Sequence, residues 1–490
     1  MHVPIWRLCC WLLPLAGLAS CNPQVKKSSA KVQIDKGTIL GFIDPSAPNV
    51  RQFLGIPYGK PPVGSRRFAP PEPVASYKGV IKATEIPQSC QQRLGSSPSV
   101  YNREILEFNL GGLNRTGRVG EDCLTLSVWA PKEVKRPVPV IVYIYGGGFS
   151  TGGQDVPYQI PTQWIQRTPE LIVVSFNYRV NIFGFPGAAG LKRQNVGLLD
   201  QRLAVEWVRD NIAAFGGDPD KISLWGQSAG AASVSYFSYA WTEDPIVKGY
   251  IMDSPYTGAV TTSPLNTTGF TTVAKSIGCG GLSPTKELEC VRSKDADQVE
   301  DAIAATGQSF GPTADDIVVF ENYTQRALQG KMAKGPAIIG TNSEDGVPFI
   351  PYGSGGDEEA STQIMLSLFF CASWTMTKNR LAAGESTYRF EYHGNFSNIS
   401  PSPWLGAYHS AELPLVFGTH SLYRGASTSF ENATSRVMQE SWLSFARKLN
   451  PGWPAGETEV NYPVQHFAQD GKTARLGNTK EFEERCKSLE

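Results

Sequence analysis

The 490-residue sequence lacks an excess of charge of either sign and has little histidine. It contains 45 Lys and Arg residues against 45 Asp and Glu residues, without long runs of either sign. Neither a nucleic-acid-binding surface nor a patch for anionic membranes is therefore predicted. Beyond the N-terminus, no apolar run reaches the roughly 20 residues that span a membrane, so no stable membrane span is expected. With only five histidines, any chemistry that needs an imidazole has few candidates.

The N-terminus has the pattern of a secretory signal. A basic residue precedes an apolar stretch from Leu8 to Leu18, and small residues follow at positions 19 and 20. We expect residues 1–20 to be a signal peptide, residues 21–490 to form one catalytic domain, and the protein to be secreted to the extracellular space. A bacterial lipobox ending at Cys21 is the alternative. Six Asn-x-Ser/Thr glycosylation candidates favour a eukaryotic secretory pathway: Asn114, Asn266, Asn322, Asn395, Asn398 and Asn432.

Nine cysteines are present, and three of them lie within the first 21 residues. An even number remains in the mature chain, which in a secreted protein indicates disulfides. These are Cys90, Cys123, Cys279, Cys290, Cys371 and Cys486.

Hydrophobic periodicity predicts an α/β protein. The continuous β-branched runs 138–145 and 171–176 are typical of strands that are covered on both faces. A helical spacing of apolar residues follows over 200–215, and further strand-like runs occur at 222–225, 250–252, 337–340 and 387–392. Such alternation predicts a mainly parallel sheet flanked by helices. Residues 22–36 are polar, so we expect disorder there and an ordered body that begins near Val32.

The sequence around Ser228 predicts a catalytic nucleophile. Gly226-Gln227-Ser228-Ala229-Gly230 lies between a short apolar run and a small-residue stretch of helical length. A strand that turns sharply into a helix would place the serine hydroxyl at the apex of the turn. A second Gly-x-Ser-x-Gly match surrounds Ser150, but the glycines and the proline after it leave no room for a helix.

A serine hydroxyl needs a base, an orienting acid and oxyanion donors. The residues alone leave the base open among His393, His409, His420 and His466, with a slight preference for His409. The acid would be Glu344 or Asp345, which follow a predicted strand. The glycine triplet 146–148 at another strand end, together with the backbone N–H of Ala229, suits an oxyanion hole.

Several ordered blocks resemble the type-B carboxylesterase/lipase family, which includes cholinesterases and fungal secreted esterases. The resemblance runs from about residue 55 to 464 and includes the blocks GIPYGKPPVGSRRF, EDCLTLSVWAP, YGGGF, NYRVNIFGF, GQSAG and LGAYHSAELPLVFG. It implies the α/β-hydrolase fold and carboxylic-ester hydrolysis without a metal or cofactor.

Matched residue by residue, the family's catalytic triad falls on Ser228, Asp345 and His409. Its oxyanion hole falls on Gly147, Gly148 and Ala229. The resemblance also implies disulfides Cys90–Cys123 and Cys279–Cys290, which leave Cys371 to pair with Cys486. It further implies the structural ion pairs Arg67–Glu121 and Arg179–Asp200.

The sequence departs from the family pattern at several positions. Asp345 stands where glutamate is usual, so Glu344 stays an alternative acid. Gln227 and Tyr145 replace a common glutamate and a common histidine, respectively. Pro255 after Ser254 replaces a usual glycine, which leaves a supporting role for Ser254 open. Only 24 residues separate Gly346 from Cys371, which suggests a shortened pocket wall.

We therefore expect a secreted esterase that acts on a small-molecule or lipid ester. Two alternatives stay open. One is a lipase in which the Cys90 to Cys123 loop acts as a lid, and the other is a non-catalytic adhesion ectodomain of the same fold. Choline esters are disfavoured, because that loop contains no tryptophan to hold a quaternary ammonium group.

Overall fold

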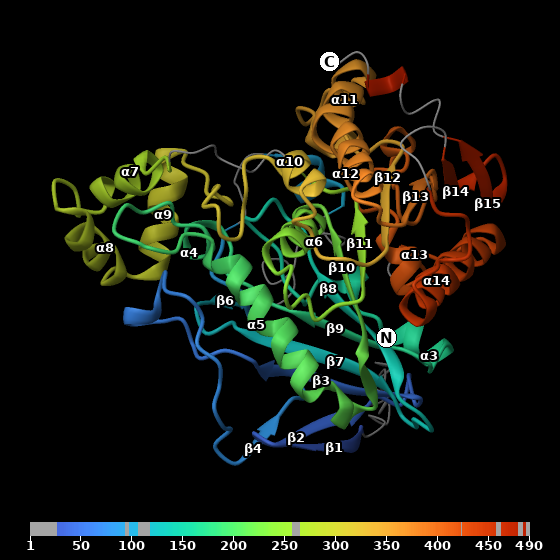
Figure 1. The fold of residues 1–490 in the computed structure, drawn as a ribbon, viewed down its shortest axis with the longest axis horizontal. Helices are drawn as coiled ribbons and strands as arrows, with labels where there is room; N and C mark the ends of the chain where they lie inside the picture. Colours follow the sequence, from blue (N-terminus) through green and yellow to red (C-terminus); the bar gives the residue numbers. More distant parts are fainter. Residues whose placement is uncertain are drawn as a thin grey trace, which may run out of the picture.

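The computed structural model describes residues 27–93, 98–105, 118–256, 265–422, 424–456, 462–478 and 484–486. A mixed sheet of 13 strands runs through it, in the order β1-β2-β3-β7-β9-β8-β10-β11-β12-β13-β14-β15, with β4 beside β2 (Figure 1). The first strands are β1 (Ser28–Ile34), β2 (Gly37–Ile43), β3 (Val50–Pro57), β4 (Val80–Lys82), β7 (Thr125–Pro131), β8 (Val138–Ile144) and β9 (Ile172–Phe176). The others are β10 (Gly217–Gln227), β11 (Gly249–Asp253), β12 (Ala337–Asn342), β13 (Thr387–Tyr392), β14 (Pro463–Gln469) and β15 (Lys472–Asn478). A separate two-stranded sheet pairs β5 (Ser89–Cys90) with β6 (Val119–Gly120).

The centre of the large sheet is parallel, as the sequence predicts. Every neighbouring pair from β9 to β14 runs parallel. Antiparallel pairs are found on both sides of this centre. The predicted apolar runs become β8 and β9, and both strands are buried almost throughout. The carboxyl ends of the parallel strands share one edge, where loops can bring distant residues together.

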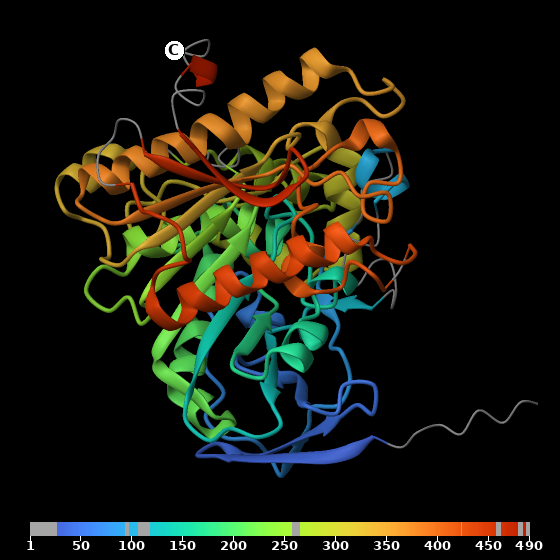
Figure 2. The ribbon, with the colours of Figure 1, turned by 90° about the vertical axis from the view of Figure 1, so that its right-hand side faces the viewer.

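Helices cover both faces of the sheet. Those before the midpoint of the chain are α1 (Val100–Arg103), α3 (Thr162–Arg167), α4 (Asn181–Gly184), α5 (Val196–Asn211) and α6 (Ala229–Ala240). Those after it are α7 (Thr268–Ser276), α8 (Pro284–Arg292), α9 (Ala296–Thr306), α10 (Tyr323–Leu328), α11 (Glu358–Met365), α12 (Cys371–Ala382), α13 (Leu413–Phe417) and α14 (Ser429–Lys448). In Figure 2, α12 (orange) and α14 (orange-red) lie on opposite sides of the red strands β14 and β15. Within the described ranges, no helix is both long and apolar enough to cross a membrane.

Alternation along β10 explains how the two helix layers pack. Trp225 points toward the α13 and α14 side, where its ring stacks on Phe417 at 4.8 Å and meets Trp442 at 6.4 Å. Gly226, one residue later, faces α6, and a Cβ at this position would collide with the backbone of Gly230. The glycine therefore lets α6 pack closely on the strand that precedes the Ser228 turn.

The N-terminal expectation of disorder up to residue 36 is wrong for the residues that the structure describes. β1 begins at Ser28, and its side chains at positions 30, 32 and 34 are buried while those between them are exposed. This period of two is typical of a strand with one buried face, and every residue of β1 has a register partner in β2. The prediction of disorder relied on the polar composition of this segment and overlooked its alternation.

Disulfides and buried ion pairs fasten the loops around the sheet. The structure joins Cys90 to Cys123, Cys279 to Cys290 and Cys371 to Cys486. Arg179 pairs with Asp200 at 2.7 Å and Arg67 pairs with Glu121 at 2.5 Å, which confirms both implied ion pairs. Each arginine also donates to backbone carbonyls of distant loops, so the pairs act as clamps between segments.

The glycosylation candidates differ in accessibility. Asn266, Asn322 and Asn395 are exposed, Asn432 is half-buried, and Asn114 lies outside the described residues. Asn398 is only 5% exposed. Its Nδ2 donates to the carbonyl of His420 at 2.7 Å and to Ser427 Oγ at 3.1 Å. A glycan on that nitrogen would have no room, so the structure disfavours Asn398 as a modified residue.

Candidate active site

Ser228 occupies a strained turn between β10 and α6. β10 ends at Gln227 and α6 begins at Ala229, which leaves Ser228 with φ 58° and ψ −124°. This backbone conformation is costly for a residue with a side chain and is characteristic of functional turns. Gly230 permits it, because a Cβ there would collide with the carbonyl group of Ile144. The strand, turn and helix predicted from the sequence are all present.

His409 and Asp345 form a buried pair. Nδ1 of His409 lies 2.8 Å from Oδ1 of Asp345, and the two residues are 2% and 0% exposed. The Asp345 side chain is fixed by two further donors to its Oδ2. These are the backbone N–H of Asn342 and the hydroxyl of Ser254, each at 2.8 Å. Ser254 thus reaches the Asp345 carboxylate despite the proline that follows it.

The second ring nitrogen of His409 faces Gln227. The side-chain nitrogen Nε2 of Gln227 lies 3.1 Å from Nε2 of His409. If Nδ1 carries the proton toward Asp345, Nε2 has a lone pair that can accept this amide hydrogen bond. Among the described residues, no hydrogen bond joins Ser228 Oγ to His409, although both side chains line the same cavity. Contacts of this kind are frequently long without substrate and tighten when it binds.

The glycine loop after β8 lies across this cavity from His409. Gly147 and Gly148 have φ angles of 110° and 63°, which residues with a Cβ rarely adopt. A Cβ on Gly147 would also collide with the carbonyl group of Thr151. In the described part of the chain, the N–H groups of Gly147 and Gly148 have no protein acceptor. Ala229, as the first residue of α6, has an N–H group that no carbonyl within the helix can accept.

The cavity itself has a volume of about 270 Å³, and Tyr101, Tyr145 and Phe349 are the aromatic side chains in its lining. Phe349 and Phe369 pack against the imidazole of His409, with ring centroids at 5.4 and 4.3 Å. Tyr101, from α1, meets Phe349 at 5.6 Å and donates to the carbonyl oxygen of His409 at 3.4 Å. Sequence reasoning missed these three side chains, because no motif marks them. Both phenylalanines belong to the segment between Gly346 and Cys371, so the shortened segment still supplies pocket wall.

Two further buried carboxyl groups lie near Asp345. Burial raises the pKa of Asp253 well above its usual range, although Trp225 Nε1 donates to this carboxyl at 2.6 Å. Burial likewise raises the pKa of Glu412, which accepts from Asn342 Nδ2 at 2.5 Å. Their burial favours the protonated forms, which limits repulsion around Asp345.

The other residues that the sequence offered as acid, nucleophile or base do not join the Ser228 site. Oε2 of Glu344 accepts from the backbone N–H of Ala407 at 3.0 Å, and the residue does not line the Ser228 cavity. Ser150 Oγ donates to the carbonyl of Gly148 at 3.3 Å within the glycine loop. His420 lies beside Ser427 and Glu431, and burial lowers its pKa to about 4. His393 and His466 adjoin Glu391 in a separate cluster.

A parallel sheet, a strained serine between strand and helix, and a His–Asp pair in the serine's cavity define an α/β-hydrolase. The chain matches the family model described as the Carboxylesterase family over residues 28–366 and 358–488, and it belongs to this family. It is thus a carboxylic ester hydrolase.

Three relatives illustrate the range of this likeness. The chain is 43% identical over 500 residues to a chlorogenic acid esterase of Aspergillus niger, covering 95% of this chain and 96% of that protein. It is 41% identical over 526 residues to secreted lipase 5 of Gibberella zeae, covering 97% of each. A mouse (Mus musculus) cholinesterase is 31% identical over 485 residues, covering 85% of this chain and 78% of the relative.

Proposed function

We propose that this protein is a secreted esterase that works through an acyl-enzyme on Ser228, with His409 as general base and Asp345 as the orienting acid. The observation that carries the proposal is the 2.8 Å contact between His409 Nδ1 and Asp345 Oδ1 beside a strained serine in the same cavity. Secretion is supported by three disulfides, which persist in oxidising compartments, and by the name of the Gibberella zeae relative. Residues 1–20 are proposed as the signal peptide and 21–490 as one catalytic domain.

The first half of the reaction forms the acyl-enzyme. Ser228 Oγ attacks the ester carbonyl carbon while its proton passes to Nε2 of His409, and Asp345 stabilises the resulting imidazolium. The N–H groups of Gly147, Gly148 and Ala229 donate to the oxygen that becomes negative. Collapse of the tetrahedral intermediate breaks the ester C–O bond, and His409 returns the proton to the leaving alcohol. Water then attacks the acyl-enzyme through the same groups and releases the acid.

Gln227 takes part in these reaction steps, because its side-chain amide is hydrogen-bonded to Nε2 of His409 when no substrate is bound. For His409 to accept the serine proton, Nε2 must exchange its 3.1 Å contact with Gln227 for one with Ser228 Oγ. A neutral amide is released more readily than a carboxylate would be, since hydrogen bonds to charged groups are stronger. The glutamine therefore holds the imidazole in place without competing strongly with the serine.

The aromatic walls favour a soluble ester with a flat or short acyl group. Tyr101, Phe349 and the glycine loop enclose a volume of about 270 Å³, and flat rings pack well between aromatic side chains. The 43% identity to a chlorogenic acid esterase supports the same preference. A lipase is the second candidate, because secreted lipase 5 is 41% identical. Half of the proposed lid between Cys90 and Cys123, residues 94–97 and 106–117, lies outside the described residues.

Covalent labelling tests the proposed nucleophile directly. A fluorophosphonate probe should react with one residue, and peptide mapping by mass spectrometry should find the label on Ser228. The Ser228→Ala variant should lose labelling and hydrolysis of a short p-nitrophenyl ester together. The matched control, Ser150→Ala, alters the other Gly-x-Ser-x-Gly serine and should keep both. Labelling of the parent elsewhere, or none at all, would contradict the mechanism and favour a binding protein of this fold.

A substrate series then separates the two esterase types. Hydrolysis of chlorogenic acid and of short p-nitrophenyl esters should exceed that of emulsified long-chain triglycerides by more than tenfold. A rate that rises sharply when the triglyceride passes its solubility limit would instead establish a lipase.

A further inference from the structure

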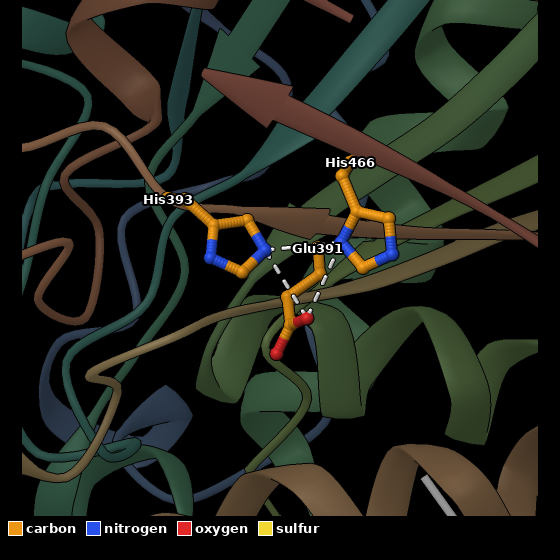
Figure 3. A group of neighbouring side chains, drawn as sticks. All are labelled: Glu391, His393 and His466. Carbon is orange, nitrogen blue, oxygen red and sulfur yellow. Dashed lines mark hydrogen bonds and ion pairs between the residues drawn. The ribbon is translucent and has the colours of Figure 1, made fainter. Parts of the chain in front are cut away.

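A second constellation of histidine and carboxylate lies near the edge of the sheet on β13 and β14. Glu391 and His466 are register partners on these adjacent parallel strands, so their side chains project from the same face. His393 follows two residues after Glu391, and its N–H continues the ladder by donating to the carbonyl of Phe467. The strand period of two therefore brings all three side chains to one face, as Figure 3 shows.

Three atoms of this cluster converge on one point. Nε2 of His393 lies 3.0 Å from Nδ1 of His466 and 3.2 Å from Oε2 of Glu391. The remaining distance, from His466 Nδ1 to Glu391 Oε2, is 3.5 Å. Zinc is bound by imidazole nitrogen and carboxylate oxygen at about 2.0–2.2 Å, and tetrahedral angles then separate ligand atoms by about 3.3–3.5 Å. The observed triangle has close to this size.

The surroundings fix the ligands and leave one side accessible. His466 and Glu391 side chains are 3% and 5% exposed, whereas that of His393 is 18% exposed. Arg485 Nη1 holds the other carboxylate oxygen of Glu391, Oε1, at 3.1 Å. This leaves Oε2 facing the two imidazoles. An outer partner of this kind is common where a carboxylate binds a metal, because it fixes the direction of the ligand oxygen.

The cluster is separate from the catalytic site. Neither Glu391 nor the two histidines line the cavity that holds Ser228 and His409. Phe390 and Phe467, the strand neighbours of Glu391 and His466, point to the opposite face and pack on Trp442 of α14. The cluster thus lies on the α12 side of the sheet, near the segment that the Cys371–Cys486 disulfide attaches.

We propose that Glu391, His393 and His466 form a binding site for a divalent transition-metal ion of the zinc type. The ligands are Oε2 of Glu391, Nε2 of His393 and Nδ1 of His466, with a water molecule at the accessible fourth position. Two imidazoles and one carboxylate favour zinc and its late first-row neighbours over calcium or magnesium, which prefer oxygen ligands. The ion would join β13 to β14 and, through Glu391 and Arg485, to the C-terminal segment. It has no part in the proposed ester hydrolysis.

The competing account is a hydrogen-bonded ion pair, in which a proton shared among the two imidazoles and Glu391 fills the same space. The two accounts differ in what the cluster does when free zinc is supplied. A metal site takes up one ion per chain with a defined coordination, while an ion pair does not.

Titration calorimetry on the tag-free, chelator-treated protein provides the test. Adding ZnCl2 should show one site per chain and raise the unfolding temperature. Cobalt(II) at the same site should give the visible absorption bands of a four-coordinate ion, which zinc should abolish on addition. Absence of stoichiometric zinc uptake by the parent would overturn the proposal.

Variants assign the ion to this cluster. His393→Asn changes the most exposed of the three ligands and should weaken zinc binding at least tenfold. Glu391→Gln should have the same effect and replaces the first variant if that one does not fold. His420→Asn, a buried histidine outside the cluster, should bind zinc like the parent. Parent-like binding by folded His393→Asn and Glu391→Gln variants would overturn the assignment. Ester hydrolysis by each variant serves as the check of folding.

Discussion

In the part of the chain that the structure describes, two buried pairings of imidazole with carboxylate lie near the carboxyl ends of neighbouring strands. Asp345 follows β12 and holds His409, while Glu391 ends β13 and adjoins His393 and His466. The residue types are the same in both regions, yet the arrangements differ. At Asp345 one imidazole has one nitrogen on the acid and the other turned toward a cavity. At Glu391 two imidazole nitrogens converge on one carboxylate oxygen.

Because the residue types are the same, any difference in chemistry between the two regions would come from how the side chains are arranged. A single imidazole between an acid and an open cavity can move a proton to and from a hydroxyl. Two imidazoles whose nitrogens lie 3.0 Å apart can direct their lone pairs at one point, and this arrangement suits a cation. Of the two regions, only the first lies beside the glycine loop 146–148 and the strained turn at Ser228.

The largest expected difference between the two regions is found by replacing one histidine of each region and comparing the rates of ester hydrolysis. His409→Ala should lower kcat for a p-nitrophenyl ester by about 10⁴ to 10⁶-fold, because serine loses its base. His393→Asn, the matched substitution in the other region, should stay within about threefold of the parent since it contacts no reacting atom. Steady-state kinetics on both purified variants, with circular dichroism to verify folding, gives the comparison. Equal losses in the two variants would mean that the regions are not functionally distinct.

A second exchange concerns the acid. Asp345→Asn should reduce kcat by about 10⁴-fold, because an amide no longer favours the His409 tautomer that accepts the serine proton. Glu344→Gln should change kcat less than tenfold, since Glu344 contacts the backbone of Ala407 and not His409. A pH–rate profile of each variant separates lost catalysis from misfolding. A larger loss in Glu344→Gln would identify Glu344 as the acid.

The sequence was sufficient to predict those elements of the proposed catalytic site that are local. The strand, turn and helix around Ser228 and the glycine loop each lie within one continuous segment, where periodicity and glycine spacing are informative. The choice of base is different. Ranking His409 above three other histidines depends on Asp345, which lies 64 residues away and meets it only in the folded sheet. The residues left that choice open, and family resemblance was needed to make it.

The aromatic side chains of the pocket and the second histidine cluster depend on tertiary contacts, which leave no pattern in the local sequence. Phe349 and Phe369 are ordinary apolar residues until tertiary packing brings both rings onto His409. Similarly, Glu391 and His466 are 75 residues apart, and only the register of β13 with β14 makes them neighbours. The alternation in β13 predicted a strand, but both of its faces are buried, because α12 and α14 cover the sheet on opposite sides.

A buried carboxylate whose hydrogen-bond partner is an amide and not an imidazole sharpens the comparison. Glu300, on α9, is 3% exposed, and the Nδ2 group of Asn181 lies 3.2 Å from its Oε2. Asn181 in turn donates its backbone N–H to the carbonyl of Phe149, the residue after Gly148. Burial raises the pKa of Glu300 to about 7, with the nearby charge of Arg93 only partly offsetting this. In contrast, the His393 hydrogen bond and nearby positive charges outweigh burial at Glu391 and lower its pKa to about 2.

The raised pKa makes the contribution of Glu300 to stability depend on pH in a defined direction. Its stabilising protonated form is fully present below the unfolded value of 4.5 and is lost as the pH rises through about 7. Glu300→Gln should therefore stabilise the protein at pH 8, by at most about 3 kcal/mol, and change little at pH 4. Urea unfolding of parent and variant across this range measures the effect. If the gain were the same at both pH values, the pKa of Glu300 would be the same in the folded and unfolded protein, and burial without an imidazole partner would not raise it.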